Sequence, residues 1–169
     1  MRPYRDEDAP LLFSAAIESA ETVGRWMPWC HAQYASEDSA VWVKKSQACW
    51  HTGEEYSFAL FDHAGQYVGG AGLNHFNRDH NIANLGYWVR QSRQRQGFAV
   101  AAARCLAKFG FETLGLTRIE IIAATDNRAS RRVAEKCGAE FECLARNRLV
   151  IRDDPVTAAV YSLIPTPRS

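Results

Sequence analysis

The chain has 169 residues, of which 47% are hydrophobic and 23% charged, which is enough for one globular domain with an adequate core. Its formal net charge of +1 gives the whole molecule no electrostatic bias toward nucleic acid or anionic membranes, so we expect neither as a partner. The N-terminus is charged from the start, and no apolar run approaches the roughly 20 residues that cross a bilayer, so we expect a cytoplasmic protein.

The cysteines indicate a reduced protein without a metal. They form no C-x-x-C pair, and no cysteine and histidine pair has the spacing of a tetrahedral metal site. We expect mostly buried thiols, because the cytoplasm is reducing, and a disulfide between Cys137 and Cys143 is the less favoured alternative. The five residues are Cys30, Cys49, Cys105, Cys137 and Cys143.

Two helices are predicted at the start of the chain. Acidic residues and Pro10 precede an apolar face that runs to about Ser19. The stretch Ser36-Glu37-Asp38-Ser39 is typical of an N-cap with an acidic first turn, and the second amphipathic helix should run to about His51.

The segment between these helices, residues 20–35, contains Trp26-Met27-Pro28-Trp29 and then His31. Two tryptophans flanking a proline in a loop predict a hydrophobic anchor beneath that loop. The same side chains can also form the wall of a pocket, and the two interpretations are compatible.

Three consecutive strands follow. Tyr56–Phe61 and Tyr67–Phe76 should form a hairpin around the turn at residues 62–65. A polar turn then leads to Ile82–Val89. Strands joined by such short connections predict an antiparallel meander.

The stretch from Leu85 to Glu112 combines a strand, a loop over Arg90–Gly97 and a helix from about Phe98. The first turn of a helix has N–H groups without intrahelical partners and a partial positive charge, so this arrangement predicts an anion site that fits a pyrophosphate. Gly97 allows close backbone approach, and Ala99 keeps the next turn narrow. Positive charge in the loop comes from Arg90, Arg93 and Arg95.

Other interpretations of this loop remain open at the level of spacing. The pattern is neither a G-x-G-x-x-G fingerprint nor a P-loop, and an ordinary connection with a surface arginine cluster would look the same. A mononucleotide-binding α/β domain is a further alternative. The meander before the loop argues against it, because doubly wound domains begin with βαβ units.

The remainder predicts a strand, a short helix and a hairpin. The strand Arg118–Thr125 follows the helix that starts at about Phe98, so it should lie parallel to the strand Ile82–Val89 that precedes this helix. Asp126-Asn127 is expected to cap the short helix and Gly138 to end it, while Arg152-Asp153-Asp154-Pro155 forms the hairpin turn and Pro165-Thr166-Pro167 a tail. The elements are Arg118–Thr125, Arg128–Lys136, Glu140–Ile151 and Val156–Ile164.

The loop Gln94-Arg95-Gln96-Gly97-Phe98-Ala99 resembles the Q/R-x-x-G-x-G/A acyl-CoA pyrophosphate loop of the GNAT N-acetyltransferases. Ala83–Val89 resembles the A-E-I-G-Y-W-[LV] strand of their RimJ/RimL-like group, which acetylates α-amino groups. Residues 126–130 with 135–141 resemble that group's N-x-x-S…K-x-G-F segment. Tyr161-Ser162-Leu163 resembles its terminal strand, and Trp26-Met27-Pro28-Trp29 resembles its tryptophan-containing acceptor loop. The resemblance covers nearly the whole chain.

This resemblance implies an α/β (α+β) GNAT fold over residues 1–169 as a single domain. Its features are a mixed central sheet with an antiparallel meander, a pair of parallel strands splayed at a bulge, and flanking helices. Splaying would leave a strand edge with free N–H and C=O groups.

The resemblance also implies the positions of the cofactor and the acceptor. The backbone of Tyr87 to Val89 would pair with the pantetheine arm, the loop amides would hold the pyrophosphate, and Ser130 would protonate the departing thiolate or stabilise the developing oxyanion. The implied cofactor-binding residues are Tyr87, Trp88, Val89, Gln94, Arg95, Gln96, Gly97, Phe98, Ala99, Asn127 and Ser130. Trp26, Trp29 and His31 would border the acceptor. Taken without the resemblance, Asn127 and Ser130 read as a helix cap and an ordinary first-turn serine.

Two features depart from the family pattern. Asn84 stands where the group often has a glutamate base, and an amide cannot take a proton. Asn84 could orient a water, the amine could arrive deprotonated, or His75 could act as the base, although a lone strand histidine is more often structural. Met1-Arg2-Pro3-Tyr4 leaves little of the family's first strand, which should be short or missing.

We therefore predict an enzyme that transfers an acetyl group from acetyl-CoA to a primary amine by direct attack in a ternary complex. The acceptor would be a small molecule, a peptide or a protein terminus carrying an α-amine. The alternative is a non-catalytic acyl-CoA-binding module on the same fold, as Asn84 could suggest. A monomer or a homodimer is expected.

Overall fold

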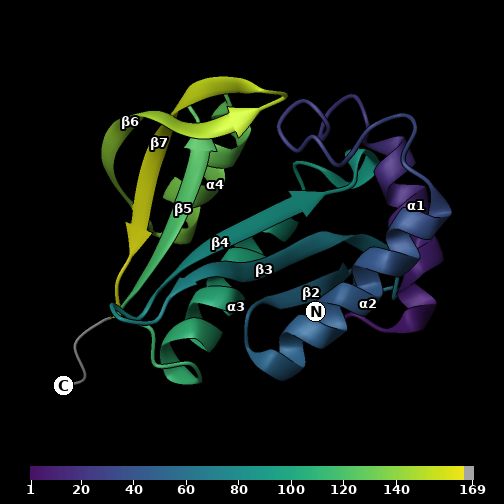
Figure 1. Ribbon diagram of the computed structural model, residues 1–169, viewed down its shortest axis with the longest axis horizontal. Helices are drawn as coiled ribbons and strands as arrows, with labels where there is room; N and C mark the ends of the chain where they lie inside the picture. Colours follow the sequence, from purple (N-terminus) through teal and green to yellow (C-terminus); the bar gives the residue numbers. More distant parts are fainter. Residues whose placement is uncertain (166–169) are drawn as a thin grey trace.

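A computed structural model describes residues 1–165, in which seven strands form one mixed sheet of order β1-β2-β3-β4-β5-β7-β6 (Figure 1). Only β4 and β5 are parallel, and the other neighbours are antiparallel. The predicted fold is confirmed, including the meander and the parallel pair. The elements are β1 (Arg2–Pro3), α1 (Ala9–Glu18), α2 (Ser36–Thr52), β2 (Tyr56–Phe61), β3 (Tyr67–Asn77), β4 (Ile82–Val89), α3 (Phe98–Glu112), β5 (Arg118–Ala124), α4 (Arg128–Cys137), β6 (Glu140–Ile151) and β7 (Asp154–Leu163).

The two faces of the sheet are covered by different helices. Strand residues alternate between faces, so Phe58 packs in the core beneath α3 while Ala59 packs with Leu12 of α1 and Val43 of α2. The α3 side holds the larger core, which includes Leu106. The α1 and α2 side is where β3 and β4 carry several glycines, and this leaves room for a cavity.

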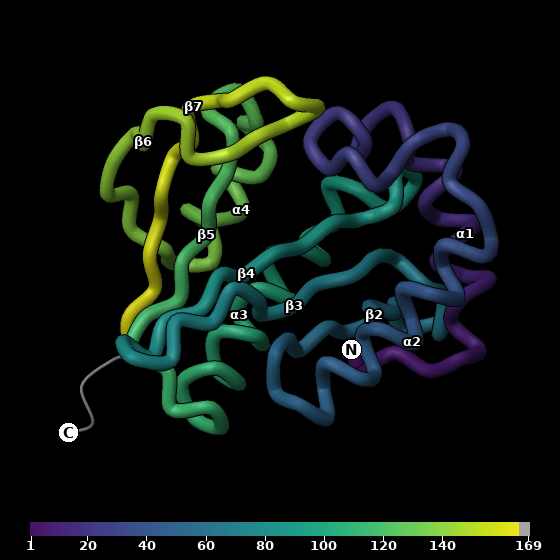
Figure 2. Tube along the Cα trace, in the orientation of Figure 1, coloured from purple at the N-terminus to yellow at the C-terminus, as the bar shows by residue number. Residues whose placement is uncertain are grey.

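The tip of the β6–β7 hairpin reaches the loop between α1 and α2 (Figure 2). Arg152 at that tip donates a hydrogen bond of 2.9 Å to the carbonyl of Gly24. This contact joins the two halves of the sheet at the end where β4 and β5 diverge.

The structure corrects two local predictions, the start of β7 and the N-cap of α2. β7 begins at Asp154 because Arg152 and Asp153 alone make the turn, with φ of 51° and 68°, as in a two-residue hairpin. Pro155 is tolerated in that strand because it pairs only with β6, since β5 ends opposite Ala158. The N-cap of α2 is Ala35, whose N–H donates to the carboxylate of Asp38.

Other predictions can be compared directly. The first strand is short, as expected, and Arg2 pairs with Ala59. All five cysteines are free, but Cys105 and Cys143 are exposed, so the expectation of mostly buried thiols is only partly right. Thr166 and Pro167 of the predicted tail lie outside the described residues. No helix within residues 1–165 is long and apolar enough to cross a membrane.

Candidate active site

A gap opens between β4 and β5. The two strands pair at three positions, the last being Asn84 with Glu120, and then diverge (Figure 1). β4 stays in register with β3 from Asn84 to Val89, so the splay needs no bulge in that part of β4, contrary to the sequence prediction. From Leu85 onward β4 therefore presents an edge that pairs with no strand and can hydrogen-bond an extended ligand, although the Val89 carbonyl oxygen already accepts from Gln94 Nε2 at 3.1 Å.

The loop before α3 ends in a backbone cradle. Gly97 is the N-cap of α3 with φ of 86°, and a Cβ placed there would meet no atom within 4 Å. In the described part of the chain no acceptor takes the N–H groups of Gly97, Phe98 and Ala99. Free amides at a helix N-terminus facing open space fit a diphosphate.

Two of the three arginines in this loop have other partners. Arg90 pairs with Glu18 at the end of α1, and Arg93 pairs with Asp62. The prediction that all three supply charge to a ligand is therefore wrong, because two are neutralised by carboxylates distant in sequence. Among the described residues Arg95 has no ion-pair partner, and it is exposed.

Glu18 anchors this loop to α1. Its carboxylate accepts hydrogen bonds from Arg90 Nε at 2.9 Å and from the Ser92 N–H at 2.7 Å. Burial raises the pKa of Glu18, but these hydrogen bonds and the charge of Arg90 outweigh burial and lower that pKa to about 2. The loop is thus held in place by a charge-assisted contact.

Replacing Glu18 by Gln should lower the free energy of unfolding by about 2 kcal/mol at pH 7. A lowered pKa means that this stabilisation is present above the ordinary value of 4.5 and is lost as pH falls through about 2. Urea denaturation should therefore show that the difference in unfolding free energy between Glu18→Gln and wild type is smaller at pH 3 than at pH 7. Glu21→Gln removes an exposed carboxylate nearby as a control. An equal loss in both variants would contradict the assignment.

Ser130 lies in the first turn of α4, and Tyr87 of β4 reaches it across the gap. The Tyr87 hydroxyl donates to the Ser130 carbonyl oxygen at 2.9 Å and lies 3.1 Å from Ser130 Oγ. Because its single proton is given to the carbonyl, the phenol oxygen is free to accept from Oγ. Asn127 caps α4, since its Oδ1 accepts the Ser130 N–H at 3.1 Å, and its Nδ2 keeps its donors for other partners.

The Tyr87 phenol stays protonated at working pH. Burial raises its pKa well above the ordinary value, and the hydrogen bond with Ser130 only partly offsets this. A protonated phenol next to a serine hydroxyl can donate or relay a proton, but it cannot act as a base.

A cavity of about 230 Å³ lies on the α1 and α2 face of the sheet, and Tyr87 is among its lining residues. Its floor contains Gly70 and Gly72 of β3 and Gly86 of β4. The space above the two β3 glycines is occupied, because a Cβ at Gly70 would lie 2.5 Å from the Tyr4 hydroxyl and one at Gly72 would lie 2.8 Å from the Tyr56 carbonyl oxygen. Among the described residues, a Cβ at Gly86 would meet no protein atom within 4 Å, so Gly86 is the floor position that faces open space.

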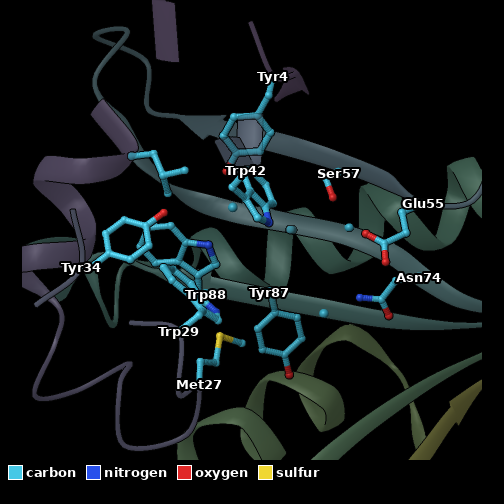
Figure 3. Close-up of a pocket in the computed structure, with 15 residues that line it drawn as sticks. Tyr4, Met27, Trp29, Tyr34, Trp42, Glu55, Ser57, Asn74, Tyr87 and Trp88 are labelled. Carbon is cyan, nitrogen blue, oxygen red and sulfur yellow. The ribbon is translucent and has the colours of Figure 1, made fainter. Parts of the chain in front are cut away.

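The cavity has an aromatic end and a polar end (Figure 3). The aromatic walls are Tyr4, Trp29, Tyr34, Trp42 and Trp88, and Met27 also contributes. Glu55, Ser57 and Asn74 lie at the other end.

The predicted acceptor residues are only partly brought together. Trp29 lines the cavity and stacks edge to face with Trp88, while Trp26 and His31 are not among the lining residues. His75 is also outside the lining, exposed at an irregularity of β3 with φ of 51°. Asn84 donates its amide N–H to Asn74 Oδ1 at 2.8 Å.

Sequence reasoning missed Glu55, the one carboxylate in the lining. A signal was present: Glu55, directly before β2, and Ser57 within it alternate with the core residues Tyr56 and Phe58, so their side chains point to the same side. Ser57 pairs with Gly72, which shows that this is the glycine-bearing face.

Free helix amides, an open strand edge and a cavity that reaches this edge at Tyr87 are the features of an acyl-CoA-dependent transferase on this mixed sheet. A family model described as the Acetyltransferase (GNAT) domain matches residues 1–140. The chain belongs to this family, and it is an N-acetyltransferase whose cofactor is acetyl-CoA.

Relatives cover nearly the whole chain. A provisionally named ribosomal N-acetyltransferase of Bacillus subtilis, YdaF, is 27% identical over 97% of this chain and 90% of its own. The structure of a provisionally described ribosomal-protein-serine acetyltransferase from Vibrio cholerae is 31% identical, with a TM-score of 0.82, covering 97% of this chain and 92% of its own. Mycobacterium smegmatis RimJ in complex with CoA-disulfide has a TM-score of 0.88 over 99% of this chain and 83% of its own; at 23% identity this likeness shows the fold.

Proposed function

We propose that the acceptor is a primary amine, above all the α-amine of a peptide, a protein N-terminus or an aminoacyl compound. Tyr87 carries this proposal, because it lines the cavity and also contacts Ser130 across the gap. An amine in the cavity and a thioester in the gap would meet at this residue. The names of the Bacillus and Vibrio relatives support a protein amine.

The cofactor supplies an activated acetyl thioester, and the residues of this chain would bind and orient it. The amides of Arg95 to Ala99, Gln96 included, would hold the diphosphate, as the free N–H groups of Gly97, Phe98 and Ala99 suggest. Gln94 would border this site, since its own N–H donates to the Gln91 carbonyl oxygen at 3.3 Å. The open edge at Tyr87 to Val89 would pair with the pantetheine arm. Asn127 Nδ2 would donate to the cofactor. Holding both reactants in line supplies much of the rate advantage.

As the carbon–nitrogen bond forms and the carbon–sulfur bond breaks, Ser130 would give its hydroxyl proton to the sulfur and regain a proton from the amine nitrogen, while the nearby Tyr87 phenol would keep Oγ in position. Asn84 would act indirectly, by fixing the amide of Asn74 at the cavity. We propose no proton-transfer role for His75, whose ring lies outside the lining.

Incubation of the purified protein with acetyl-CoA and a panel of amines tests the function. The panel should include peptides with different N-terminal residues, amino-acid amides and polyamines. We expect thiol release above the amine-free control with the α-amines. Tight CoA binding by calorimetry without release on any amine would instead favour the non-catalytic module.

Ser130→Ala should lower kcat by roughly 100-fold with little change in the KM for either substrate, as expected for loss of a proton donor. Ser130→Thr keeps a hydroxyl at the same position and should retain most of the activity. Steady-state kinetics of the two variants measure this. Equal activity of Ser130→Ala and wild type would rule out the role.

We further propose that the 169 residues act as one domain in the cytoplasm, as a monomer or a homodimer, without nucleic acid. The seven strands of the described region form one sheet, which supports the single domain. Size-exclusion chromatography with light scattering distinguishes the two oligomeric states.

A further inference from the structure

We infer that Glu55 recognises the ammonium group of the acceptor, and that the aromatic walls of the cavity hold the apolar group attached to it. This inference rests on the proposed function and specifies its substrate class. Glu55 directly precedes β2, and its carboxylate lies at the polar end of the cavity beside Asn74 (Figure 3).

Glu55 is available to a ligand. In the described part of the chain, no hydrogen bond or ion pair to its carboxylate is formed, unlike Glu18 and Glu142, which are held by arginines. Among the described residues, the lining contains no lysine, arginine or histidine that could neutralise it. A carboxylate in a largely apolar hollow without a counter-charge favours a cation there.

The walls add to this preference. Tyr4, Trp42 and Trp88 present rings to the space that Glu55 faces, and aromatic faces attract cations as well as apolar groups. Burial raises the pKa of the Tyr4 and Tyr34 phenols, so neither adds a charge of its own. The cavity is thus complementary to one ammonium joined to an apolar body.

The position of the neighbouring amide supports the same occupant. Asn74 Oδ1 already accepts from Asn84, so Asn74 turns its Nδ2 donors away from that contact. A donor next to Glu55 can bind a carbonyl oxygen one bond removed from the amine, as in a peptide or an amino-acid amide. A free amino acid would instead bring its own carboxylate close to Glu55, with no cation in the lining to receive it.

The size of the hollow limits the attached group. A volume of about 230 Å³ is below the roughly 300–1,000 Å³ of pockets for drug-sized ligands. One residue or a small amine fits, and the rest of a longer acceptor would remain outside. The substrate class is therefore an α-amine whose carboxyl group is amidated or esterified and whose side chain is apolar or aromatic.

The test is direct binding to the CoA-saturated full chain, followed by the fluorescence of the cavity tryptophans. The probes are phenylalaninamide, its neutral analogue 3-phenylpropionamide, and free phenylalanine. We expect wild type to bind the amide at least 10-fold more tightly than either of the other two. Equal affinity for the three probes would overturn the inference without any variant.

Two variants separate Glu55 from a general effect of charge. Glu55→Gln should lose the preference for phenylalaninamide over the neutral analogue, while Glu54→Gln, which removes the exposed adjacent carboxylate, should keep it. The inference would be overturned if Glu55→Gln kept the preference for phenylalaninamide, or if both variants lost it equally. Unchanged CoA affinity shows that the variants are folded. Because binding is measured without turnover, the failure of this binding test and the absence of thiol release are separate outcomes, and the second counts against the proposed function.

Discussion

Gly86→Val is expected to lower kcat/KM for acetyl transfer by roughly 100-fold or more while leaving the fold intact, because small displacements of bound reactants cost this much. Gly86 lies on the cavity floor, and a Cβ there would meet no protein atom within 4 Å. The added methyl groups would therefore occupy the space of the acceptor and not that of a neighbouring side chain. Its φ is outside the left-handed region, so valine meets no backbone strain.

The stability of this variant is its own control. Glycine in a strand interior is unfavourable by about 0.5–1 kcal/mol, so Gly86→Val should unfold at the same or a slightly higher temperature than wild type. The kcat/KM of Gly86→Ala should fall between those of wild type and Gly86→Val. Calorimetry with CoA should show little change, since the site proposed for the diphosphate lies at Gly97 and not on the cavity floor. Wild-type kcat/KM in Gly86→Val would show that the acceptor binds elsewhere.

Local sequence patterns were sufficient for most of the sheet. The bounds of β2 and β4 agree with the prediction to the residue, because each is a short, mainly apolar segment flanked by polar or turn residues on both sides. The start of β7 was wrong because Asp154-Pro155 has the composition of a turn. The actual turn places Arg152 and Asp153 at positive φ, which residue type alone does not indicate.

The two parts of the site differ in how far the sequence could predict them. The cradle at Gly97 is made by residues consecutive in the chain, so spacing was informative. The ion-pair partners of the arginines in this loop could not be predicted from spacing, since Glu18 lies 72 residues from Arg90. Long-range contacts of this kind have no local signature.

The cavity shows the same limit. Its walls come from α2, from β2 to β4 and from the loop after α1, and the fold alone brings Trp29, Trp42 and Glu55 together. Trp29 was found because two tryptophans in one loop are unusual. A glutamate before a strand is common, and only its position in the cavity lining beside Ser57, which pairs with Gly72, marks Glu55 as a candidate.

Gly97→Asp is expected to weaken CoA binding by roughly 30-fold, or about 2 kcal/mol, with α3 preserved. Aspartate is a good N-cap and tolerates the left-handed conformation that Gly97 adopts at φ of 86°. Its carboxylate would stand beside the amides that the diphosphate needs. Two like charges about 5 Å apart repel by about 3 kcal/mol at an effective dielectric constant of about 20, and salt reduces this.

Gly97→Asn is the matched control, because asparagine has the same shape and the same capping and backbone tolerance without the charge. We expect it to weaken CoA binding only a few-fold. Calorimetry at low and high salt should show the CoA affinities of the two variants converging as the salt concentration rises. Thermal unfolding of both should stay near wild type. If the two variants bind CoA equally well at low salt, charge at this helix start does not govern binding, and the diphosphate must lie away from the N–H groups of Gly97 and Phe98.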